Sequence, residues 1–305
     1  MSKLRITVGP EMIRPSWDWV GFDMSRELSK YYNINIFPLE ALKSPESDLM
    51  LVIKTKPRPR FLQSAIAQKK KIIYCPIDNY QKISDVEKDR RFLAECHAIL
   101  VHCERLIPVF KPYCPIVEYV EHHNRFGLSE VSDYRSEGYA VWVGSLQYLP
   151  LVVDYLQKHP LGMQIKFVVN YPLVFRGKLA DALPIPDSHE VIHWTPRNQR
   201  DVMAGAKAAF DLKGQDFNQM HKAPVKAQKF IASGIPFAIN AESYSAEYFL
   251  NQGFKLPTLD EREYWLSRDY WAKTQSIVEG LRTKLTLESV GLVYKHIVDR
   301  VLRMP

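Results

Sequence analysis

Lysines gather on a short stretch that has the pattern of a helix start, and they are the residues of this 305-residue chain best suited to holding a phosphate. The stretch runs Lys222-Ala-Pro-Val-Lys226-Ala-Gln-Lys229-Phe-Ile-Ala-Ser-Gly234-Ile-Pro236 and leads into the apolar run Phe237–Ile239. It predicts a proline-opened helix, a Gly-Ile-Pro break and a buried strand. A helix N-terminus offers unpaired N–H groups and a partial positive charge, so this end can bind a phosphate.

Short apolar runs alternate with amphipathic stretches along the chain, and this alternation predicts the elements that must position the lysines. Strands separated by helices indicate a parallel sheet covered on both faces. The pattern stops at the polar stretch 122–137 and then begins again. We expect strands at 4–8, 33–37, 49–53, 71–75, 98–102 and 116–120, then at 139–143, 165–169, 190–193, 208–212 and 237–239, with a helical remainder from 259.

Two consecutive units of this kind predict two doubly wound, Rossmann-like α/β domains. We place the first at 1–124, a linker at 125–138, the second at 139–275, and helices that pack back on the first domain at 276–305. Ligands of such sheets bind at the carboxyl ends of the strands. We therefore expect the functional residues at those ends, along a cleft between the two domains.

Bulk composition narrows the class of protein. Hydrophobic residues make up 46% and charged residues 25%, which is typical of globular chains, and no apolar stretch approaches the roughly 20 residues of a membrane span. The start of the chain lacks a signal-peptide core, so we expect a cytoplasmic protein. The net charge of +7 favours anionic partners. The run 69–71 leads into a strand, so we expect no nucleic-acid partner, and we interpret the four cysteines as buried free thiols.

Several nucleotide and hydrolase motifs are missing from the sequence. No Gly-x-Gly occurs anywhere, which excludes the dinucleotide fingerprint, and neither a phosphate loop of the Walker type nor a Gly-x-Ser-x-Gly elbow is present. No Asp-x-Asp pair occurs either, so a metal-bridged diphosphate is not favoured. We expect no cofactor and no metal.

Four places together resemble nucleotide-sugar glycosyltransferases of the GT-B fold, most closely the large retaining family that includes many bacterial cell-envelope transferases. The resemblance covers most of the chain in pattern and is specific in the second half. The segments are Tyr139-Ala-Val-Trp-Val-Gly144-Ser145, Val191-Ile-His-Trp194-Thr-Pro-Arg197, the stretch from Phe210-Asp-Leu-Lys213-Gly214 to Ile235-Pro236, and the set Tyr74-Cys-Pro-Ile-Asp78-Asn79-Tyr80, His97-Ala-Ile-Leu-Val-His102 and Glu118-Tyr-Val-Glu-His122-His123.

The resemblance implies roles for particular residues. Two acids that the family keeps fall on His221 and Lys229, and a lysine accepts no hydrogen bonds from ribose hydroxyls. The catalytic candidates are Asp78, Glu11 and His122. The donor-binding candidates are Gly9, Gly144, Ser145, Trp194, Arg197, Lys213, His221, Lys222, Lys226 and Lys229.

The function implied is transfer of a sugar from a nucleotide-diphosphate sugar to an acceptor hydroxyl, without a metal and with retention. The acceptor class stays open between a glycan, a lipid-linked molecule and a small molecule. The apolar group at Ile13, Trp17 and Trp19 keeps open a peripheral contact with the inner face of a membrane. The alternatives are a non-catalytic GT-B relative that binds a ligand or partner, which the missing acids favour, and a GT-B enzyme of another reaction, such as a sugar-nucleotide epimerase.

Overall fold

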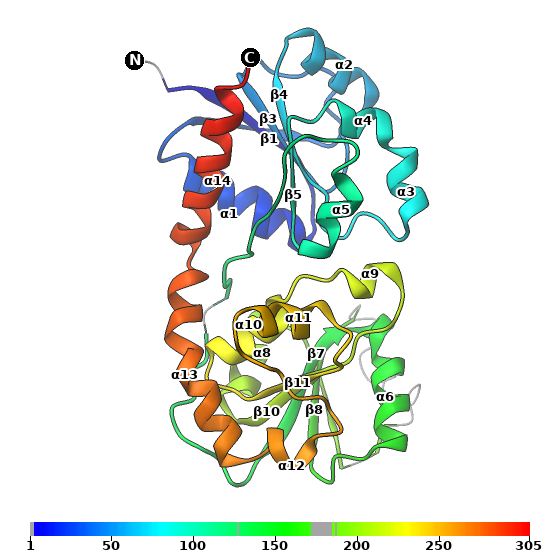
Figure 1. Cartoon of the computed structure of the whole chain (residues 1–305), viewed down its shortest axis with the longest axis vertical. Helices are drawn as coiled ribbons and strands as arrows, with labels where there is room; N and C mark the ends of the chain where they lie inside the picture. The colour runs from blue at the N-terminus through cyan, green and yellow to red at the C-terminus, as the bar shows by residue number, and fades with distance from the viewer. Residues whose placement is uncertain (1–2, 127, 172–184, 187) are drawn as a thin grey trace. The chain divides into compact units, whose positions relative to one another are not determined.

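The chain forms two compact α/β units, each built on its own parallel sheet (Figure 1). The structure, a computed structural model, describes residues 3–126, 128–171, 185–186 and 188–305, so Gly127 of the expected linker lies outside them. Unit 1 comprises Met1–Arg125, Asp216–Ala223 and Lys284–Pro305, and unit 2 comprises Phe126–Gln215 and Pro224–Thr283. The predicted fold class of two doubly wound α/β domains followed by helices is confirmed.

Unit 1 is built on a six-stranded parallel sheet of order β2-β1-β3-β4-β5-β6. Its central strands consist of apolar residues because helices cover both faces of the sheet. The strands are β1 Arg5–Glu11, β2 Asn33–Pro38, β3 Leu49–Ile53, β4 Lys71–Cys75, β5 Ala98–Val101 and β6 Val117–Tyr119. The helices are the π-helical turn η1 Trp17–Phe22, α1 Asp23–Leu28, α2 Pro59–Ala67, α3 Ile83–Lys88, α4 Arg90–Ala94, the 3-10 turn η2 Glu104–Leu106, α5 Ile107–Phe110, α9 Phe217–Met220 and α14 Leu287–Leu302.

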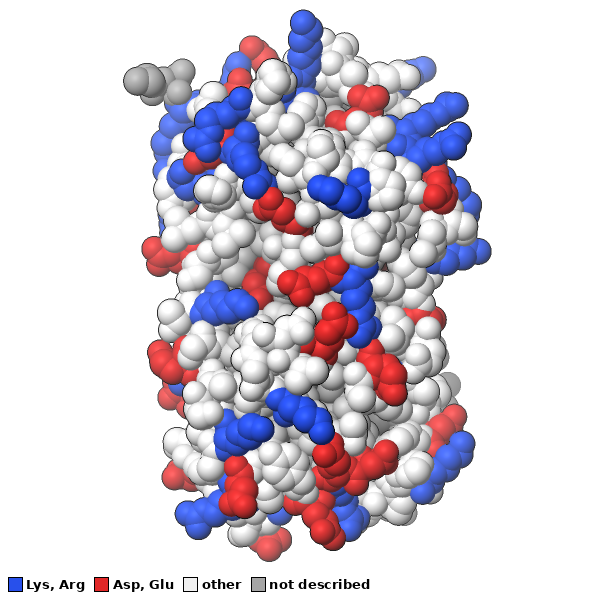
Figure 2. Space-filling model, viewed as in Figure 1, with Lys and Arg blue, Asp and Glu red and all other residues white. Residues whose placement is uncertain are grey.

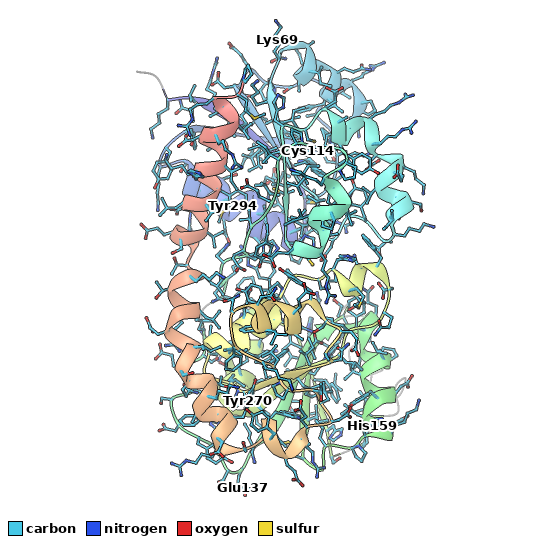
Figure 3. All side chains as sticks on the ribbon, in the orientation of Figure 1. Lys69, Cys114, Glu137, His159, Tyr270 and Tyr294 are labelled. Carbon is cyan, nitrogen blue, oxygen red and sulfur yellow. The ribbon has the colours of Figure 1, made fainter. Side chains whose placement is uncertain are left out.

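The last helix of the chain completes the core of unit 1. Helix α14 packs beside α1, and its buried face joins a cluster made by β1, β3 and α1. Tyr294 of this helix points toward the sheet, where its side chain meets Cys75 at the end of β4 (Figure 3). Burial of five large apolar side chains of α14 contributes on the order of 10 kcal/mol of gross hydrophobic stabilisation. All four cysteines are buried and free, as predicted.

Unit 2 is built on a five-stranded parallel sheet of order β11-β10-β7-β8-β9. The strands are β7 Tyr139–Ser145, β8 Ile165–Asn170, β9 Glu190–His193, β10 Ala206–Asp211 and β11 Phe237–Ile239. The helices are the 3-10 turn η3 Leu146–Tyr148, α6 Leu149–Lys158, α8 Pro196–Ala204, α10 Val225–Ala232, α11 Tyr244–Asn251, α12 Arg262–Trp265 and α13 Arg268–Lys284.

Local sequence signals set the ends of the helices in unit 2. Thr195 caps α8, since its Oγ1 accepts a hydrogen bond of 2.9 Å from the N–H of Asn198, and a proline follows at the first helical position. Helix α10 ends before Gly234, which has a φ of 78°. A Cβ there would lie 2.3 Å from the carbonyl oxygen of Val131, so only glycine fits. Tyr270 of α13 donates to the carbonyl of Phe237 at 3.0 Å and fastens that helix to β11 (Figure 3).

Candidate functional site

Asp78 lies at the carboxyl end of β4 and holds two partners from other parts of unit 1. The tight turn after the strand is closed by a 2.8 Å hydrogen bond from the N–H of Asn79 to the carbonyl of Pro76, and Asp78 has a left-handed φ of 50°. Its carboxylate lies 3.3 Å from Nε2 of His102 and 2.8 Å from Nζ of Lys222. We call Asp78, His102 and Lys222 the Asp78 cluster.

Opposing influences act on the acidity of Asp78. Burial raises its pKa, but the hydrogen bond and charge of His102, together with the ammonium of Lys222, outweigh burial. The pKa of Asp78 therefore lies well below its usual range. The carboxylate is ionised at neutral pH. Because a carboxylate of such low basicity is a weak proton acceptor, Asp78 is better suited to orienting His102 than to accepting a proton itself.

The two ring nitrogens of His102 have different surroundings: Nε2 contacts the carboxylate of Asp78, whereas Nδ1 has no partner among the described residues. The side chain is 4% exposed, and Nδ1 makes no hydrogen bond within the part of the chain that the structure describes. It lines a cavity of about 20 Å³ with Asp78, Asn79, Phe217 and His221. That volume holds about one water molecule or one hydroxyl group. With the proton on Nε2, the free lone pair of Nδ1 is a general base held in place by a carboxylate.

His122 packs against His102. The rings of His102 and His122 are stacked with centroids 6.1 Å apart, and the rings of Trp19 and His122 are stacked with centroids 6.2 Å apart. Burial lowers the pKa of His122 to about 3, helped by the neighbouring His102. His122 is therefore neutral at physiological pH, and its role in this arrangement is packing.

The remaining candidates of unit 1 are Glu11, Gly9 and His221, and of these His221 lines the cavity beside Asp78. Glu11 is the exposed last residue of β1. A Cβ on Gly9 would lie 2.6 Å from the carbonyl oxygen of Phe37, so close packing of β1 on β2 already requires glycine there. His221 accepts or donates at Nδ1 to the carbonyl of Phe217 at 2.6 Å, and burial lowers its pKa.

In unit 2 two of the predicted phosphate-binding lysines converge on one buried carboxylate. Asp211 ends β10 and is 1% exposed. Lys213 approaches it at 2.7 Å, Lys226 approaches it at 2.8 Å, and the indole N–H of Trp142 donates to it at 2.9 Å. Lys226 also lies 5.2 Å from the centre of the Trp142 ring. We call these four residues the Asp211 cluster.

Two lysines on one carboxylate leave this cluster with a formal charge of +1. Burial raises the pKa of Asp211, but the two ammonium groups more than reverse that effect and hold the pKa below its usual value. The cluster therefore keeps a cationic surplus at the carboxyl end of the sheet, where a diphosphate can bind. Part of the charge of both lysines is already neutralised within the protein.

Lys229 has a different environment from the other lysines of unit 2. Burial lowers its pKa to about 8, and its Nζ lies 5.5 Å from the centre of the Phe126 ring. Trp194 also packs against Phe126, with the ring centroids 6.0 Å apart. The indole N–H of Trp194 donates to Oε1 of Gln199 at 2.7 Å. Lys229 and Trp194 thus lie around Phe126, apart from Asp211.

Three other candidates of unit 2 have simple structural surroundings. A Cβ on Gly144 would lie 2.3 Å from the Trp142 ring, so this glycine makes room for an indole. Ser145 is the last residue of β7 and is partly buried. Arg197 is exposed on α8, and its Nε lies 3.5 Å from a carboxylate oxygen of Asp201 one helical turn later.

The structure thus divides the candidates into two groups. Asp78, His221 and Lys222 come together in unit 1, so one lysine of the lysine-rich stretch lies apart from the others; Lys213 and Lys226 come together in unit 2. Sequence reasoning missed His102 and Asp211 as site residues. Both stand directly after or at the end of a predicted strand, which was the available signal.

A cavity of about 650 Å³ in unit 2 lies away from these strand ends. Its lining includes the end of α6, the loop after it and Ile165, the first residue of β8. The amino end of a parallel sheet is not where ligands of doubly wound folds bind. In the described part of the chain, no helix combines the length and apolar character that a membrane crossing requires.

Comparison with solved structures identifies the architecture. AviGT4, a glycosyltransferase involved in avilamycin A biosynthesis, matches with a TM-score of 0.63 and 9% identity over 98% of both chains. The DNA-modifying β-glucosyltransferase, solved in the presence and absence of its substrate uridine diphosphoglucose, matches with a TM-score of 0.57 and 16% identity over 97% of this chain and 100% of that one.

An enzyme of another class shares the architecture. A putative UDP-N-acetylglucosamine 2-epimerase from Listeria monocytogenes matches with a TM-score of 0.52 and 9% identity over 100% of this chain and 98% of that one. Other matched chains are longer, and this chain spans 57% and 55% of the length of two of them. No protein-family profile matches the chain, and no curated protein matches it in sequence.

These likenesses establish the fold. The chain has the GT-B fold, as the resemblance in its sequence implied. At 9% to 16% identity, the structural similarity establishes the fold of this chain but not the reaction that it catalyses.

Proposed function

We propose that this protein transfers a sugar from a nucleotide-diphosphate sugar to an acceptor hydroxyl. The observation that carries the proposal is the likeness in fold, over nearly the whole chain, to a β-glucosyltransferase that uses uridine diphosphoglucose and to the glycosyltransferase AviGT4. In this proposal unit 2 binds the donor through the cationic surplus of the Asp211 cluster, and unit 1 binds the acceptor near the Asp78 cluster.

The reaction has two requirements: the negative charge on the leaving diphosphate must be stabilised, and the proton of the acceptor hydroxyl must be removed. The bond from the sugar C1 to the diphosphate oxygen breaks, the diphosphate leaves with the electron pair, and a new bond forms from C1 to the acceptor oxygen. Ammonium groups at Lys213 and Lys226 stabilise the negative charge that builds on the diphosphate. We propose that these cations act without a metal, and activity retained in the presence of EDTA is the expected result.

The destination of the acceptor proton sets the stereochemistry. Retention, which the resemblance implies, allows the leaving diphosphate to take the proton. The pairing of His102 with Asp78 and its free Nδ1 favour the alternative, in which His102 takes the proton and the configuration inverts. The anomeric configuration of the product, read by NMR, decides between them.

His97 provides a matched control for this test, since it immediately precedes β5 and His102 immediately follows it. Under inversion, His102→Gln lowers kcat by about 100-fold or more and removes the acid limb of the pH profile, whereas His97→Gln leaves both unchanged. A retained pH profile in His102→Gln would exclude His102 as the base.

Binding of the donor is tested first with a panel of nucleoside diphosphates by calorimetry. We expect at least one to bind, and we expect Lys226→Met to weaken the diphosphate by about tenfold more than the matching nucleoside. Lys207→Met is the control, because Lys207 lies at the amino end of β10, away from Asp211, and donates to the carbonyl of Ser136. Equal losses for nucleoside and diphosphate would remove Lys226 from this role, and no binding by any diphosphate would overturn the proposal.

A second candidate is a non-catalytic GT-B protein that binds a ligand or partner. The observation that favours it is that the predicted phosphate-binding lysines already pair with carboxylates, Lys222 with Asp78 and Lys226 with Asp211. Nucleotide binding without hydrolysis, transfer or epimerisation of any nucleotide sugar would favour this candidate over the enzyme.

A further inference from the structure

Strand β2 forms an open edge of the sheet in unit 1. It pairs with β1 on one side, and among the described residues no strand pairs with its other side. An edge strand presents a row of backbone N–H and C=O groups to its surroundings, which makes it a template for pairing with another chain. Proteins usually prevent such pairing with short edge strands, charged side chains or a covering segment.

The other edge strands that the described residues form carry this protection. They are β6, β9 and β11, which have three, four and three residues. Glu118 in β6 pairs with Arg300, and Glu190 in β9 pairs with Lys166. Strand β11 is buried along its whole length, and Tyr270 of α13 donates to the carbonyl of its first residue. Each of these edges is therefore short, and each is either charged or covered.

Strand β2 lacks that protection. It has six residues, none of them charged, and the uncharged run extends over residues 31–39. Charged side chains of both signs are spread over unit 1, the upper half of the view in Figure 2, so β2 differs from the charged surface seen there. The one proline of β2 is its last residue, Pro38, which leaves the earlier N–H groups available for pairing.

The backbone groups of Ile34 and Ile36 point away from β1. The N–H of Asn33 donates to the carbonyl of Leu4 at 2.9 Å, so the backbone of Asn33 faces β1. Because alternate residues of a strand direct their backbone groups to opposite sides, Asn35 also faces β1, and Ile34 and Ile36 face outward. The side chain of Ile36 is 44% exposed, and that of Ile34 is partly buried on the same face of the sheet. The open edge therefore combines unpaired backbone groups with apolar side chains.

A second copy of this strand is the partner that fits the edge, because the edge is complementary to itself. Two copies related by a two-fold axis present the same surface to each other, and their strands run antiparallel. With the axis beside Asn35, Ile34 of each copy lies opposite Ile36 of the other. The opposed residues exchange N–H···O=C hydrogen bonds, about four in total, and their side chains form apolar cross-strand pairs.

The charges that flank the uncharged run favour the antiparallel direction. Lys30 precedes the run and Glu40 follows it, and both are exposed. Lys3 donates from Nζ to the carbonyl of Lys30 at 3.2 Å, so this end keeps one surplus cation after the pairing of Lys30 with Glu27. Antiparallel strands place this end beside Glu40 of the second copy, where opposite charges meet, whereas parallel strands would bring like ends together.

We propose that two copies of this chain pair through β2, antiparallel and about a two-fold axis beside Asn35, so that one continuous sheet receives six strands from each copy. The area in contact is small, so we expect a reversible dimer with a dissociation constant on the order of 10 μM. The pairing needs no nucleotide or acceptor, so its test is separate from that of the proposed function.

A cysteine beside the axis tests the register. In the proposed dimer Asn35 lies directly opposite Asn35 of the second copy, with the Cα atoms about 4.5 Å apart, which is within the range of a disulfide. All four native cysteines are buried, so they should not compete. We expect Asn35→Cys in the full chain, treated with the oxidant diamide, to give a disulfide-linked dimer on a non-reducing gel.

Asn33→Cys is the matched control for this experiment. Asn33 is exposed on the same face of the same strand, but it lies opposite Phe37 of the second copy. We expect at least about tenfold less cross-linked dimer from this position, because the two cysteines are then four residues out of register. Equal cross-linking at both positions would show random collision and would overturn the proposal, as would an Asn35→Cys chain that does not cross-link.

Sedimentation equilibrium tests the association of the unmodified chain. Between about 1 and 100 μM the average mass should rise from that of one chain toward that of two. Ile36→Lys places a charge on the open edge and should weaken the dimer by at least about tenfold, with the unfolding temperature unchanged. Leu151→Lys is the control, since Leu151 lies on α6 of unit 2 with a similar exposure of 41%, and it should leave the dimer unchanged.

The remaining outcomes would each overturn the proposal. A dimer that Ile36→Lys leaves unchanged has its interface elsewhere, and equal weakening by Leu151→Lys indicates unspecific apolar association. A chain that stays monomeric at the highest concentration does not pair through β2. If the amides of Ile34 and Ile36 in such a monomer are also protected from hydrogen exchange, another segment of the same chain covers the edge.

Discussion

Lysines form ion pairs with an aspartate in both units, but the side chains of the two aspartates, Asp211 and Asp78, differ in burial. The side chain of Asp211 in unit 2 is 2% exposed and has two lysines and an indole N–H around it, while that of Asp78 in unit 1 is 31% exposed and faces one lysine and one histidine. A buried charge without its partners is far more costly than an exposed one. The same residue types therefore form a fixed structural group in unit 2 and a more adaptable one in unit 1.

This difference bears on which lysines can exchange partners. A ligand phosphate that approaches Lys226 must share it with Asp211, since removing the lysine would leave a buried carboxylate short of positive charge. Lys222 can turn from Asp78 to a ligand at lower cost, because water reaches the carboxylate. The lysines of the Asp211 cluster are thus held in place, whereas Lys222 can exchange Asp78 for a ligand at lower cost.

The largest expected effect comes from Asp211→Asn. The change keeps the shape of the side chain but leaves Lys213 and Lys226 close together without their counter-charge, so the free energy of unfolding should fall by about 3–5 kcal/mol. Urea titration followed by tryptophan fluorescence measures it. Asp201→Asn, on the exposed surface of the same unit, is the control and should change stability little. A loss from Asp211→Asn below about 1 kcal/mol would contradict the structural role of the cluster.

Lys229→Met should flatten the dependence of stability on pH, because burial lowers the pKa of this lysine to about 8. Between that value and the ordinary 10.5, the unfolded chain binds more protons, so the contribution of Lys229 to stability rises with pH there. Methionine removes the titrating group, so a rise of roughly 2 kcal/mol in the free energy of unfolding between pH 8 and pH 10.5 should vanish. An unchanged rise in the variant would contradict the lowered pKa.

Asp78→Asn should cost less than Asp211→Asn, about 1–2 kcal/mol at pH 7, since the side chain of Asp78 is partly exposed. The folded pKa of Asp78 lies below the unfolded one, so its contribution is complete above about pH 4 and is lost as the pH falls toward the folded pKa. Asparagine should therefore flatten the acid limb of the stability curve. If this variant loses as much stability as Asp211→Asn, the contrast between the units fails.

Arg197→Ala should have the smallest effect. Its side chain is 85% exposed and its ion pair with Asp201 spans one turn of α8, so the change in stability should stay within about 0.5 kcal/mol of zero. Calorimetric titration with a nucleoside diphosphate should also give an unchanged affinity. A tenfold weaker affinity would return Arg197 to the donor site that the resemblance implied.

The sheet strands were predictable because each is a short apolar run between polar turns. Leu49–Ile53 and Lys71–Cys75 have the expected bounds, since burial on both faces leaves an unbroken apolar signal. Residues 17–28 are harder to predict, because they form a π-helical turn followed by a six-residue helix. Apolar periodicity does not distinguish a π-turn from an α-turn over so few residues.

The site was harder to predict than the fold, because a sequence gives the strand end on which a residue lies but not its partner. Lys226 was placed correctly at a helix start after β10, while its pairing with Asp211 depends on how two strand-end loops meet. His102 was passed over, since an isolated histidine after an apolar strand has no spacing signature. Its significance comes from Asp78, which stands 24 positions earlier in the chain.

Helix α14 has a consequence for synthesis of the chain on the ribosome. Its apolar face covers β1, β3 and α1, but it is the last helix to be translated. At 5–20 residues per second, the sheet of unit 1 waits on the order of ten seconds for the helix that seals it, and unit 2 is made in the meantime. During that interval the nascent chain exposes the apolar surface that α14 later covers. A stop codon placed before residue 287 should therefore yield aggregates rather than a shorter soluble protein.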